Sequence, residues 1–456
     1  MKKLFVAAMF CGASLGAGFA IQTATAQPTP VRVRVPAPAP APAPFRSDPI
    51  DAPALVAAIR KVLAENYVLP ERRGPLDAAL AKGLADGRYN VADRSQLVQR
   101  INEDMDAVAH DKHLGLQYSP EQAAQLAGGR QRDDGPPSPQ QVAGAQRRNH
   151  GVAELKLFPG NIRYLDFRGF TWVGAKSAEA FDNAMRFLRD GDAVIIDLRR
   201  NGGGSPEAVQ YLISHFLEPN RPLMTFHMYA KQVDRLSTLA ELPAGRMVGK
   251  PLYVLTSGNT ASAAEEFTGH VAGFRIGEVV GETTAGAGFR NEFFALPDGY
   301  VISVSVGRAV LAATGKDWEG VGIKPTIAIE EGKALDAARM HAMRRLAATA
   351  TDPRAKDELE AMSALLAAKL DPVTPALPLA SYAGAFGERT IRVEEGKLIY
   401  QRTGGGRLTL VPVGPNVFTF EEDPLAKVIF SVAGNQASGF ELVRGDGSRV
   451  PVQRSN

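Results

Sequence analysis

Residues 252–267 read LYVLTSGNTASAAEEF. The apolar run at the start of this stretch is typical of a short strand that is buried on both faces. A polar turn then leads to Ser262, and small residues and two acids open a helix whose apolar positions, Phe267 and Val271, lie four residues apart. The stretch therefore predicts a strand, a turn and a helix, with Ser262 at the corner between turn and helix.

A serine at this corner has two chemical advantages as a nucleophile. The first turn of a helix offers N–H groups without a partner inside the helix, and the helix dipole favours negative charge there. The N–H of Ala263 would therefore stabilise an oxyanion that forms when Ser262 attacks a carbonyl. The alternative is that Ser262 only caps the helix, because serine is a preferred cap residue.

The surrounding segment, residues 151–330, alternates predicted strands and helices. Residues 162–167 and 193–198 have the apolar character of strands, and residues 178–188 have the apolar spacing of a helix. Such alternation predicts an α/β layer with at least partly parallel strands, whose sites lie at the carboxyl ends of the strands.

A glycine-rich segment, NGGG at residues 201–204, follows one of these strands. Glycine lets backbone N–H groups approach a ligand closely and permits the positive φ that an anion-binding turn requires. Phosphate binding is one interpretation, although no Lys-Ser or Lys-Thr pair follows, so the segment is not a P-loop. The other interpretations are one half of an oxyanion hole and a tight turn without a role.

A catalytic serine needs a neighbouring general base, and an acid that orients the base completes the arrangement. His113 is the candidate base, and His110, three residues earlier, is its rival. The two histidines could also bind a metal, but no Cys or Glu cluster completes such a site. Glu319 is the candidate acid; Glu265 and Glu266 compete with it, but the helix dipole already explains acids in a first turn.

The first residues, 1–26, are predicted to be a secretory signal with a small-x-small cleavage site before Gln27. Cys11, the only cysteine, lies inside this segment, and the bulky Phe10 before it argues against a lipoprotein signal. The mature chain would then have no cysteine, which excludes disulfides and thiolate catalysis. We expect a periplasmic or extracellular location in a bacterium.

The formal net charge is +3, and two of those charges belong to the predicted signal, which leaves the mature chain near +1. This balance gives no electrostatic reason to expect nucleic acid as a partner. No stretch after the signal is long and apolar enough to span a membrane.

The remaining segments predict four further parts. Residues 27–45 form a Pro/Ala-rich linker, residues 46–118 an N-terminal helical bundle, and residues 119–150 a polar, flexible insertion. Residues 331–375 read as a helical linker, and residues 376–456 as a small antiparallel β module. The predicted strands of this module lie at 390–394, 397–401, 407–411, 417–420, 427–432 and 439–443.

Four segments, IDLRRNGGG at 196–204, TASAAEEF at 260–267, GETT at 281–284 and EGVGIKP at 319–325, occur in this order. Together they resemble the tail-specific (C-terminal-processing) serine peptidase family, in particular its tricorn-core and interphotoreceptor-retinoid-binding-protein branch. The likeness covers roughly residues 50–330 and implies a mixed α/β, crotonase-like peptidase core.

By this resemblance Ser262 is the nucleophile, His113 the general base and Glu319 the acid that orients the base. The resemblance further implies that the backbone N–H groups of Gly203 and Ala263 hold the oxyanion. It implies polypeptide substrates and no need for a cofactor or metal ion.

The sequence departs from the family pattern at three points. Ala287 stands where the Ser-Lys branch of the family has its lysine, which favours His113 as the base. Lys112 stands where the tricorn-like branch has a serine, so a fourth catalytic residue is absent or supplied elsewhere. No PDZ segment is evident, which argues against recognition of a free substrate C-terminus by such a module.

The sequence thus predicts a serine endopeptidase that forms an acyl-enzyme on Ser262, with His113 as general base. The alternative is a non-catalytic module that binds apolar small ligands or peptides, as in the retinoid-binding relatives of the family. A module kept only for binding has no chemical need for Ser262, His113 and Glu319 together, so we favour the peptidase.

Overall fold

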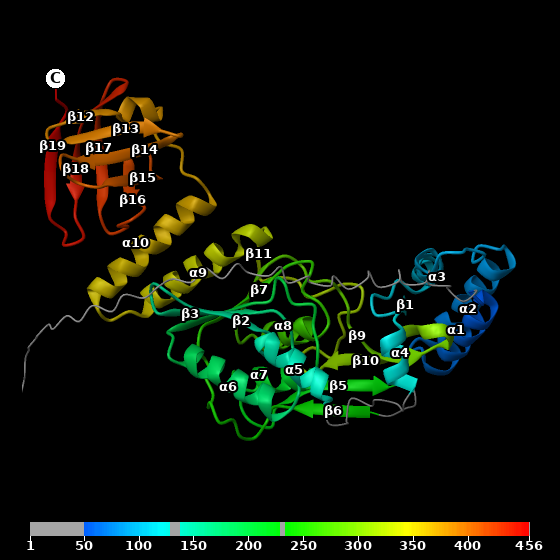
Figure 1. Cartoon of the computed structure of the whole chain (residues 1–456). Helices are drawn as coiled ribbons and strands as arrows, with labels where there is room; N and C mark the ends of the chain where they lie inside the picture. The colour runs from blue at the N-terminus through cyan, green and yellow to red at the C-terminus, as the bar shows by residue number, and fades with distance from the viewer. Residues whose placement is uncertain (1–49, 128–136, 229–232, 456) are drawn as a thin grey trace, which may run out of the picture. The chain divides into compact units, whose positions relative to one another are not determined.

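The computed structural model describes residues 50–127, 137–228 and 233–455 (Figure 1). The predicted signal and linker, residues 1–26 and 27–45, lie outside the described residues and stay predictions. None of the described helices combines the length and the apolar character needed to cross a membrane.

Three helices form the N-terminal bundle: α1 (Ala52–Asn66), α2 (Pro70–Ala85) and α3 (Arg94–Ala109). The carboxylates of Asp51 and Asp93 accept hydrogen bonds from the first-turn N–H groups of α1 and α3, at 3.0 and 2.9 Å, and so begin these helices. The apolar stripes of the three helices are buried in a common core. The predicted helical bundle is therefore confirmed.

The central sheet has six strands in the order β11-β8-β7-β4-β3-β2 (Figure 1). Five of the six strands are parallel, and only β2 at the edge runs antiparallel to its neighbour. The strands are β2 (Val152–Phe158), β3 (Ile162–Phe167), β4 (Ala193–Asp197), β7 (Leu252–Thr256), β8 (Glu278–Gly281) and β11 (Ile327–Ala328).

Helices cover both faces of this sheet. One face packs against α6 (Ala175–Arg189), α7 (Pro206–Ile213) and α8 (Ala263–Phe274). The other face packs against α9 (Ala334–Thr349) and α10 (Pro353–Leu370). Residues of β7 alternate between the two faces, with Val254 in the first core and Tyr253 and Leu255 in the second, which explains the unbroken apolar run. The mixed α/β core is confirmed.

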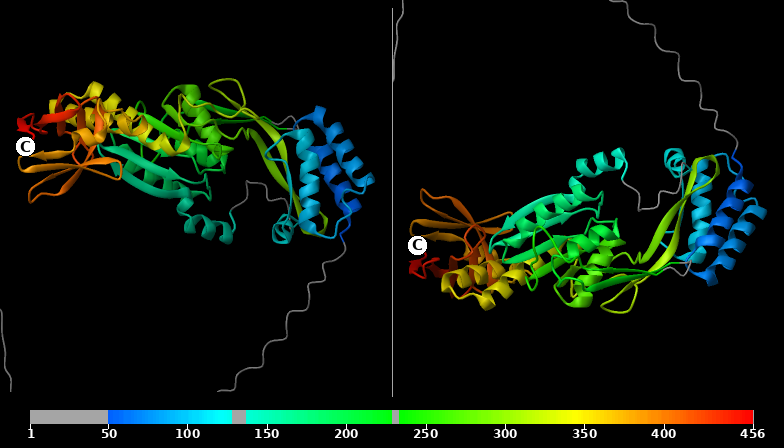
Figure 2. Two further views of the ribbon diagram at one scale, coloured as in Figure 1. Left: turned by 90° about the horizontal axis from the view of Figure 1, so that it is seen from above. Right: turned by 90° about the horizontal axis from the view of Figure 1, so that it is seen from below.

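A second, antiparallel sheet places β10 (Tyr300–Leu311) between β9 (Phe289–Ala295) on one edge and β1 (Gly115–Tyr118) and β5 (Pro222–Met228) on the other. The strand β6 (Val233–Ser237) pairs with β5. Side chains from one face of β10 enter the core of the helical bundle, and Figure 2 shows the β9–β10 hairpin beside α1 to α3. This sheet therefore joins the bundle to the α/β core.

The predicted insertion, residues 119–150, contains two helices among its described residues, α4 (Pro120–Ala127) and α5 (Pro139–Arg147). The sequence interpretation did not foresee them. A capping box begins α5, because Ser138 and Gln141 exchange side-chain to backbone hydrogen bonds of 2.8 and 3.2 Å. Short 3₁₀ segments lie at Asn149–Gly151, Pro297–Gly299, Glu331–Lys333 and Leu379–Tyr382.

The C-terminal module is an eight-stranded antiparallel sheet in chain order. Its aromatic residues fill one core, and the N–H of Ser455 donates to the carbonyl of Ala385 at 2.9 Å, which brings the two ends of the sheet together. The predicted β module is confirmed, with one unpredicted strand at each end. The strands are β12 (Gly384–Phe386), β13 (Arg389–Glu394), β14 (Lys397–Arg402), β15 (Arg407–Gly414), β16 (Val417–Phe420), β17 (Lys427–Ala433), β18 (Gln436–Val443) and β19 (Arg449–Gln453).

Candidate active site

Ser262 lies at the corner between β7 and α8, in a backbone conformation that L residues rarely adopt. Its φ is 54° and its ψ is −121°. An ordinary helix cap has extended backbone angles, and Ser205, which caps α7, has them, with φ −82° and ψ 132°. The Ser205 hydroxyl accepts from the N–H of Glu207 at 3.1 Å, as a cap should. Strain of the kind seen at Ser262 costs about 1–3 kcal/mol and concentrates at functional sites, because it re-aims a side chain.

Glu265 holds this strained corner in place. Its side chain is fully buried, with 0% exposed, and accepts four hydrogen bonds. The donors are the N–H groups of Ser262 (2.9 Å), Gly286 (2.6 Å) and Ala287 (2.8 Å) and the hydroxyl of Thr284 (2.6 Å). From the sequence, the helix dipole alone explains the position of Glu265 in the first turn of the helix. The structure shows that its carboxylate also accepts hydrogen bonds from a distant segment, which the sequence did not predict. Glu265 therefore joins the Ser262 corner to the segment that follows β8.

Replacing Glu265 with alanine is expected to destabilise the fold. The change leaves four donors without their acceptor, and each buried unsatisfied donor costs about 1–3 kcal/mol, so the free energy of unfolding should fall by about 3 kcal/mol or more. Urea unfolding of the variant measures this. The control is Glu358→Ala, whose exposed ion pair with Arg354 should change stability by about 0.5 kcal/mol or less. Equal effects of the two substitutions would contradict the role given to Glu265.

The glycine segment touches the serine corner. A Cβ atom added to Gly203, whose φ is +108°, would lie 2.7 Å from the Cβ of Ser262 and 3.0 Å from the N of Ala263, so only glycine fits there. The N–H of Gly203 donates to the side-chain oxygen of Asn201 at 2.9 Å. The N–H of Ala263, in contrast, donates to no other described residue. Of the two predicted oxyanion donors, the N–H of Gly203 is thus already hydrogen-bonded, and the N–H of Ala263 has no acceptor among the described residues.

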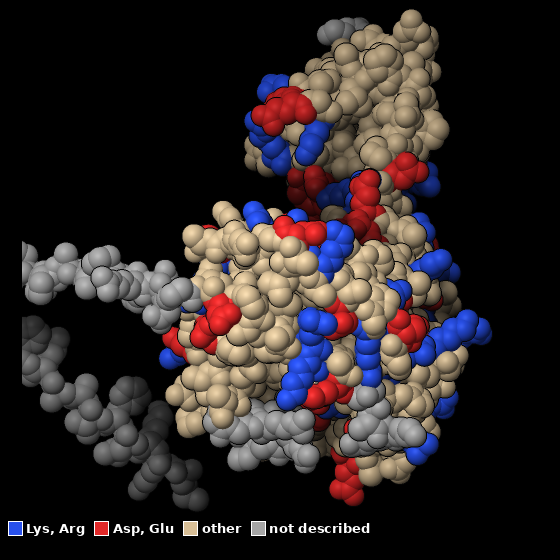
Figure 3. All heavy atoms as spheres, turned by 90° about the vertical axis from the view of Figure 1, so that its right-hand side faces the viewer, with Lys and Arg blue, Asp and Glu red and all other residues tan. Residues whose placement is uncertain are grey.

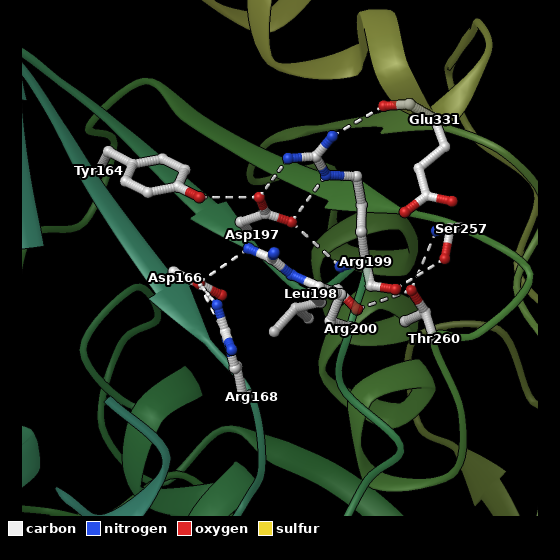
Figure 4. Close-up of polar contacts among 10 residues, drawn as sticks. All are labelled: Tyr164, Asp166, Arg168, Asp197, Leu198, Arg199, Arg200, Ser257, Thr260 and Glu331. Carbon is white, nitrogen blue, oxygen red and sulfur yellow. Dashed lines mark hydrogen bonds and ion pairs between the residues drawn. The ribbon is translucent and has the colours of Figure 1, made fainter. Parts of the chain in front are cut away.

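A buried ion pair between Asp197 and Arg199 lies at the end of β4, just before the glycine segment in the sequence (Figure 4). The Asp197 carboxylate, only 1% exposed, accepts from the Arg199 guanidinium at 2.6 and 2.9 Å and from the Tyr164 hydroxyl at 2.8 Å. Burial raises the pKa of Asp197, but the Arg199 guanidinium outweighs this and leaves the pKa below its usual value. The Thr260 hydroxyl donates to the carbonyl of Leu198 at 2.8 Å. These bonds fix the ends of β4 and β7, where the glycine segment and the serine corner begin.

His113 lies in the turn between α3 and β1. Its backbone N–H donates to the carboxylate of Asp111 at 2.9 Å. Burial lowers the pKa of the His113 ring below its usual value, and the negative charges of Asp111 and Glu265 oppose this effect. Burial therefore favours the neutral ring, which is the form that a general base requires.

Glu319 lies in the turn before β11, and its carboxylate is partly satisfied. One oxygen, Oε2, accepts from the N–H groups of Gly288 at 2.6 Å and Phe289 at 2.9 Å. Burial raises the pKa of Glu319 to about 7, the hydrogen bond from Gly288 opposes the shift, and the nearby Asp111 charge adds to it. Glu319 therefore titrates close to neutral pH.

His113 and Glu319 lie in one electrostatic neighbourhood, because the charges of Asp111 and Glu265 influence the pKa of both residues. The Nδ1 atom of His113 and the Oε1 atom of Glu319 are both buried, and neither has a hydrogen-bond partner among the described residues. Within the same residues no hydrogen bond joins the hydroxyl of Ser262 to the His113 ring. The structure thus places His113 and Glu319 in one region. The two atoms that a catalytic triad would join, Nδ1 of His113 and Oε1 of Glu319, each have no hydrogen-bond partner among the described residues.

Neither lysine position offers a better base. Ala287, at the position of the family's lysine, is 4% exposed, and its N–H is held by Glu265. The ammonium group of Lys112 donates to the carbonyl of Ala285, but the side chain is exposed. A lysine acts as a base when burial favours its neutral form, and an exposed lysine lacks that condition.

Another serine and histidine are hydrogen-bonded elsewhere in the core. The Nδ1 atom of His150 lies 2.9 Å from the hydroxyl oxygen of Ser177, which also accepts from the N–H of Val173 at 2.9 Å. Ser177 is 0% exposed and His150 5%, so a substrate has no access to either group. This pair fixes the start of α6 and is structural.

Comparison with known families supports the same region. Residues 160–329 match the family model described as Peptidase family S41, and residues 50–150 match the N-terminal domain of Peptidase_S41 in eukaryotic IRBP. The first match includes Ser262 and Glu319, and the second includes His113. Together the two matches span more than half of the chain.

Curated relatives are more distant. The chain is 28% identical over 183 residues to the carboxy-terminal processing protease CtpB of Bacillus subtilis (strain 168), over 40% of this chain and 36% of the relative. It is 28% identical over 168 residues to the carboxyl-terminal-processing protease of Synechocystis sp. (strain ATCC 27184 / PCC 6803 / Kazusa), over 36% of this chain and 38% of the relative. The chain thus covers little more than a third of the length of these relatives.

A solved lipoprotein from Streptococcus agalactiae has a TM-score of 0.46 at 16% identity, over 65% of this chain and 98% of that one.

Proposed function

The chain belongs to peptidase family S41, and on this premise we propose that it is a serine peptidase that hydrolyses peptide bonds through an acyl-enzyme on Ser262. The backbone of Ser262 carries the proposal. A helix cap does not need φ 54° and ψ −121°, whereas a nucleophile that must project from a strand–turn–helix corner does.

In this mechanism Ser262 attacks the substrate carbonyl, and His113 accepts its proton. Glu319 orients the His113 ring by accepting a hydrogen bond from Nδ1 at its own Oε1. Both atoms are buried and have no hydrogen-bond partner among the described residues. The N–H of Ala263 donates to the oxyanion as it forms. As the C–N bond breaks, the His113 ring gives this proton to the leaving amine. Water then attacks the acyl-enzyme and gives a proton to His113, which passes that proton to the Ser262 oxygen as the acid product leaves.

The natural substrate class is a polypeptide, as the family and the CtpB relative suggest. The face drawn in Figure 3 has Lys and Arg next to Asp and Glu, without a continuous basic area among its described residues. On this face, therefore, no basic patch for nucleic acid is seen among the described residues. We further propose the tail-specific subtype, because both curated relatives carry a carboxy-terminal-processing name.

Hydrolysis of denatured casein and of a mixed peptide library by the purified full chain tests the proposal. We expect cleavage inside peptides, detected by mass spectrometry, and loss of this cleavage in Ser262→Ala. If the wild-type protein cleaves nothing and instead binds apolar small ligands or peptides intact, the non-catalytic alternative replaces the peptidase.

The pH dependence of cleavage should report Glu319. The ring of His113, whose pKa is lowered, is neutral before Glu319 ionises, so the later ionisation near pH 7 should limit activity. Activity is therefore expected to rise with pH through about 7 and then level off. In Glu319→Gln the rise near 7 should disappear, and turnover should fall by about 10²–10⁴-fold.

Stability gives an independent measurement of the same carboxyl group. The pKa of Glu319 is raised in the fold from its ordinary 4.5 to about 7, so the folded state binds this proton more tightly than the unfolded state does. The resulting contribution to the free energy of unfolding is complete below pH 4.5 and is lost as pH rises through 7. Relative to wild type, Glu319→Gln should therefore gain stability between pH 5 and pH 8. An unchanged difference in the free energy of unfolding across this range would contradict the raised pKa.

A further inference from the structure

A groove lies directly beside His113, on the face of the antiparallel sheet that does not pack against the helical bundle. Gly115 of β1 pairs with Ser303 of β10, and Ser303 pairs with Phe293 of β9, so these three residues form one row across the sheet. Their neighbours in the strands, Leu116, Ile302 and Phe294, point to the opposite face and pack in the bundle core. A cavity of about 260 Å³ lies over the row, and His113 is part of its lining.

Gly115 forms an open floor for this groove. A Cβ atom added to Gly115 would meet no heavy atom within 4 Å, and its φ is not positive. Larger residues could therefore occupy this position without backbone strain. The absence of a side chain at Gly115 leaves the space in which a substrate side chain would lie.

The lining has hydrogen-bond donors and no carboxylate. Lys112 lies at the groove, and its ammonium group donates to the carbonyl of Ala285, which leaves two of its three N–H donors for a ligand. The hydroxyl oxygen of Ser303 accepts from the side-chain amide of Asn291 at 2.7 Å, which leaves the hydroxyl proton available to a ligand. The Phe293 ring, 46% exposed, provides an apolar surface beside these polar groups.

We propose that this groove is a substrate subsite for a side chain with an apolar stem and an acceptor end, as in glutamate or glutamine. The stem lies along the Phe293 ring, and the end accepts from the hydroxyl of Ser303 and the ammonium of Lys112. Lysine and arginine side chains are disfavoured, because no carboxylate lines the groove and Lys112 repels them. This inference rests on the proposed function, since the substrate peptide must extend past His113.

Peptide binding to the Ser262→Ala variant tests the subsite without any need for turnover. A binding scan of a peptide library against Ser262→Ala first locates the peptide position whose side chain matters. Peptides with Glu, Gln, Ala or Lys at that position, each amidated at its C-terminus, are then titrated against Ser262→Ala. We expect the Glu peptide to bind about fivefold more tightly than the Lys peptide, as for an exposed charge contact, with the Gln peptide between them.

Two substitutions in the groove should change this order. Gly115→Trp fills the groove and should weaken binding of the Glu and Gln peptides by about tenfold, with little effect on the Ala peptide. Lys112→Glu should reverse the preference between the Glu and Lys peptides. The matched control is Gly406→Trp in the C-terminal module, where an added Cβ also meets no atom within 4 Å.

The outcomes separate the subsite from the proposed function. Equal binding of the four peptides, or an order that neither substitution changes, would overturn the subsite even if the protein hydrolyses peptides. The protein could instead hydrolyse no peptide and still bind the Glu peptide more tightly than the Lys peptide, with Gly115→Trp removing this preference. That result would support the subsite and reject the peptidase. An Ala peptide with a free C-terminus that binds as tightly as the amidated Glu peptide would overturn the side-chain subsite, because the groove would then hold a terminal carboxylate.

Discussion

Ser262→Ala is expected to abolish peptide hydrolysis while the protein stays folded. Removal of a serine nucleophile leaves no group that can form the acyl-enzyme, and losses on the order of 10⁴-fold or more in turnover follow in such enzymes. The substitution removes one oxygen at a half-buried position and adds no atom, so we expect the fold to be kept. Release of peptides from casein, measured beside circular dichroism of the same sample, gives both results.

The matched control for this substitution is Ser205→Ala. Ser205 is a true helix cap with ordinary backbone angles, so its loss should cost about 1 kcal/mol of stability and leave hydrolysis close to wild type. If Ser262→Ala instead behaves like Ser205→Ala, losing stability and keeping activity within tenfold, then Ser262 is only a cap.

His113→Ala is expected to have the second-largest effect. Without a base near Ser262 the hydroxyl is a weak nucleophile, and turnover should fall by about 10³-fold or more. Burial lowers the pKa of the His113 ring below its usual value. In the wild-type protein the ring should therefore be uncharged, and able to accept a proton, around pH 7.

Two neighbours of His113 serve as controls in the same assay. His110 is exposed and occupies the left-handed position that ends α3, so His110→Ala should keep most of the turnover. Lys112→Ala removes an exposed ammonium that contacts a backbone carbonyl, and with a peptide that has alanine at the subsite position this variant should also keep most of the turnover. A large loss in Lys112→Ala together with an active His113→Ala would return the Ser-Lys mechanism and reject the histidine base.

The strand–turn–helix stretch and the strands of the core could be predicted because their signals are local. A continuous apolar run such as 252–255 is typical of a strand buried on both faces, and β7 shows why, with helices on either side. The caps Asp93 and Ser205 could be predicted for the same reason, since a cap depends only on the few residues that follow it.

The arrangement around Ser262 could not be predicted in the same way. The acceptor role of Glu265 depends on the hydroxyl of Thr284 and the N–H groups of Gly286 and Ala287, which lie in the segment after β8 and come to Glu265 only through the fold. The bond from Gly203 to Asn201 and the antiparallel pairing of β1 with β10 are likewise products of tertiary structure. Periodicity carries no information about such contacts, because they join segments that are distant in the sequence.

Labelling with a fluorophosphonate probe, followed by peptide mapping, tests the central claim most directly. The probe forms a covalent bond only with an activated serine, so it reports the nucleophile without knowledge of the substrate. We predict a single adduct on the peptide that contains Ser262, no adduct in Ser262→Ala, and much slower labelling in His113→Ala. An adduct on another serine, or rapid labelling that does not depend on His113, would contradict the account.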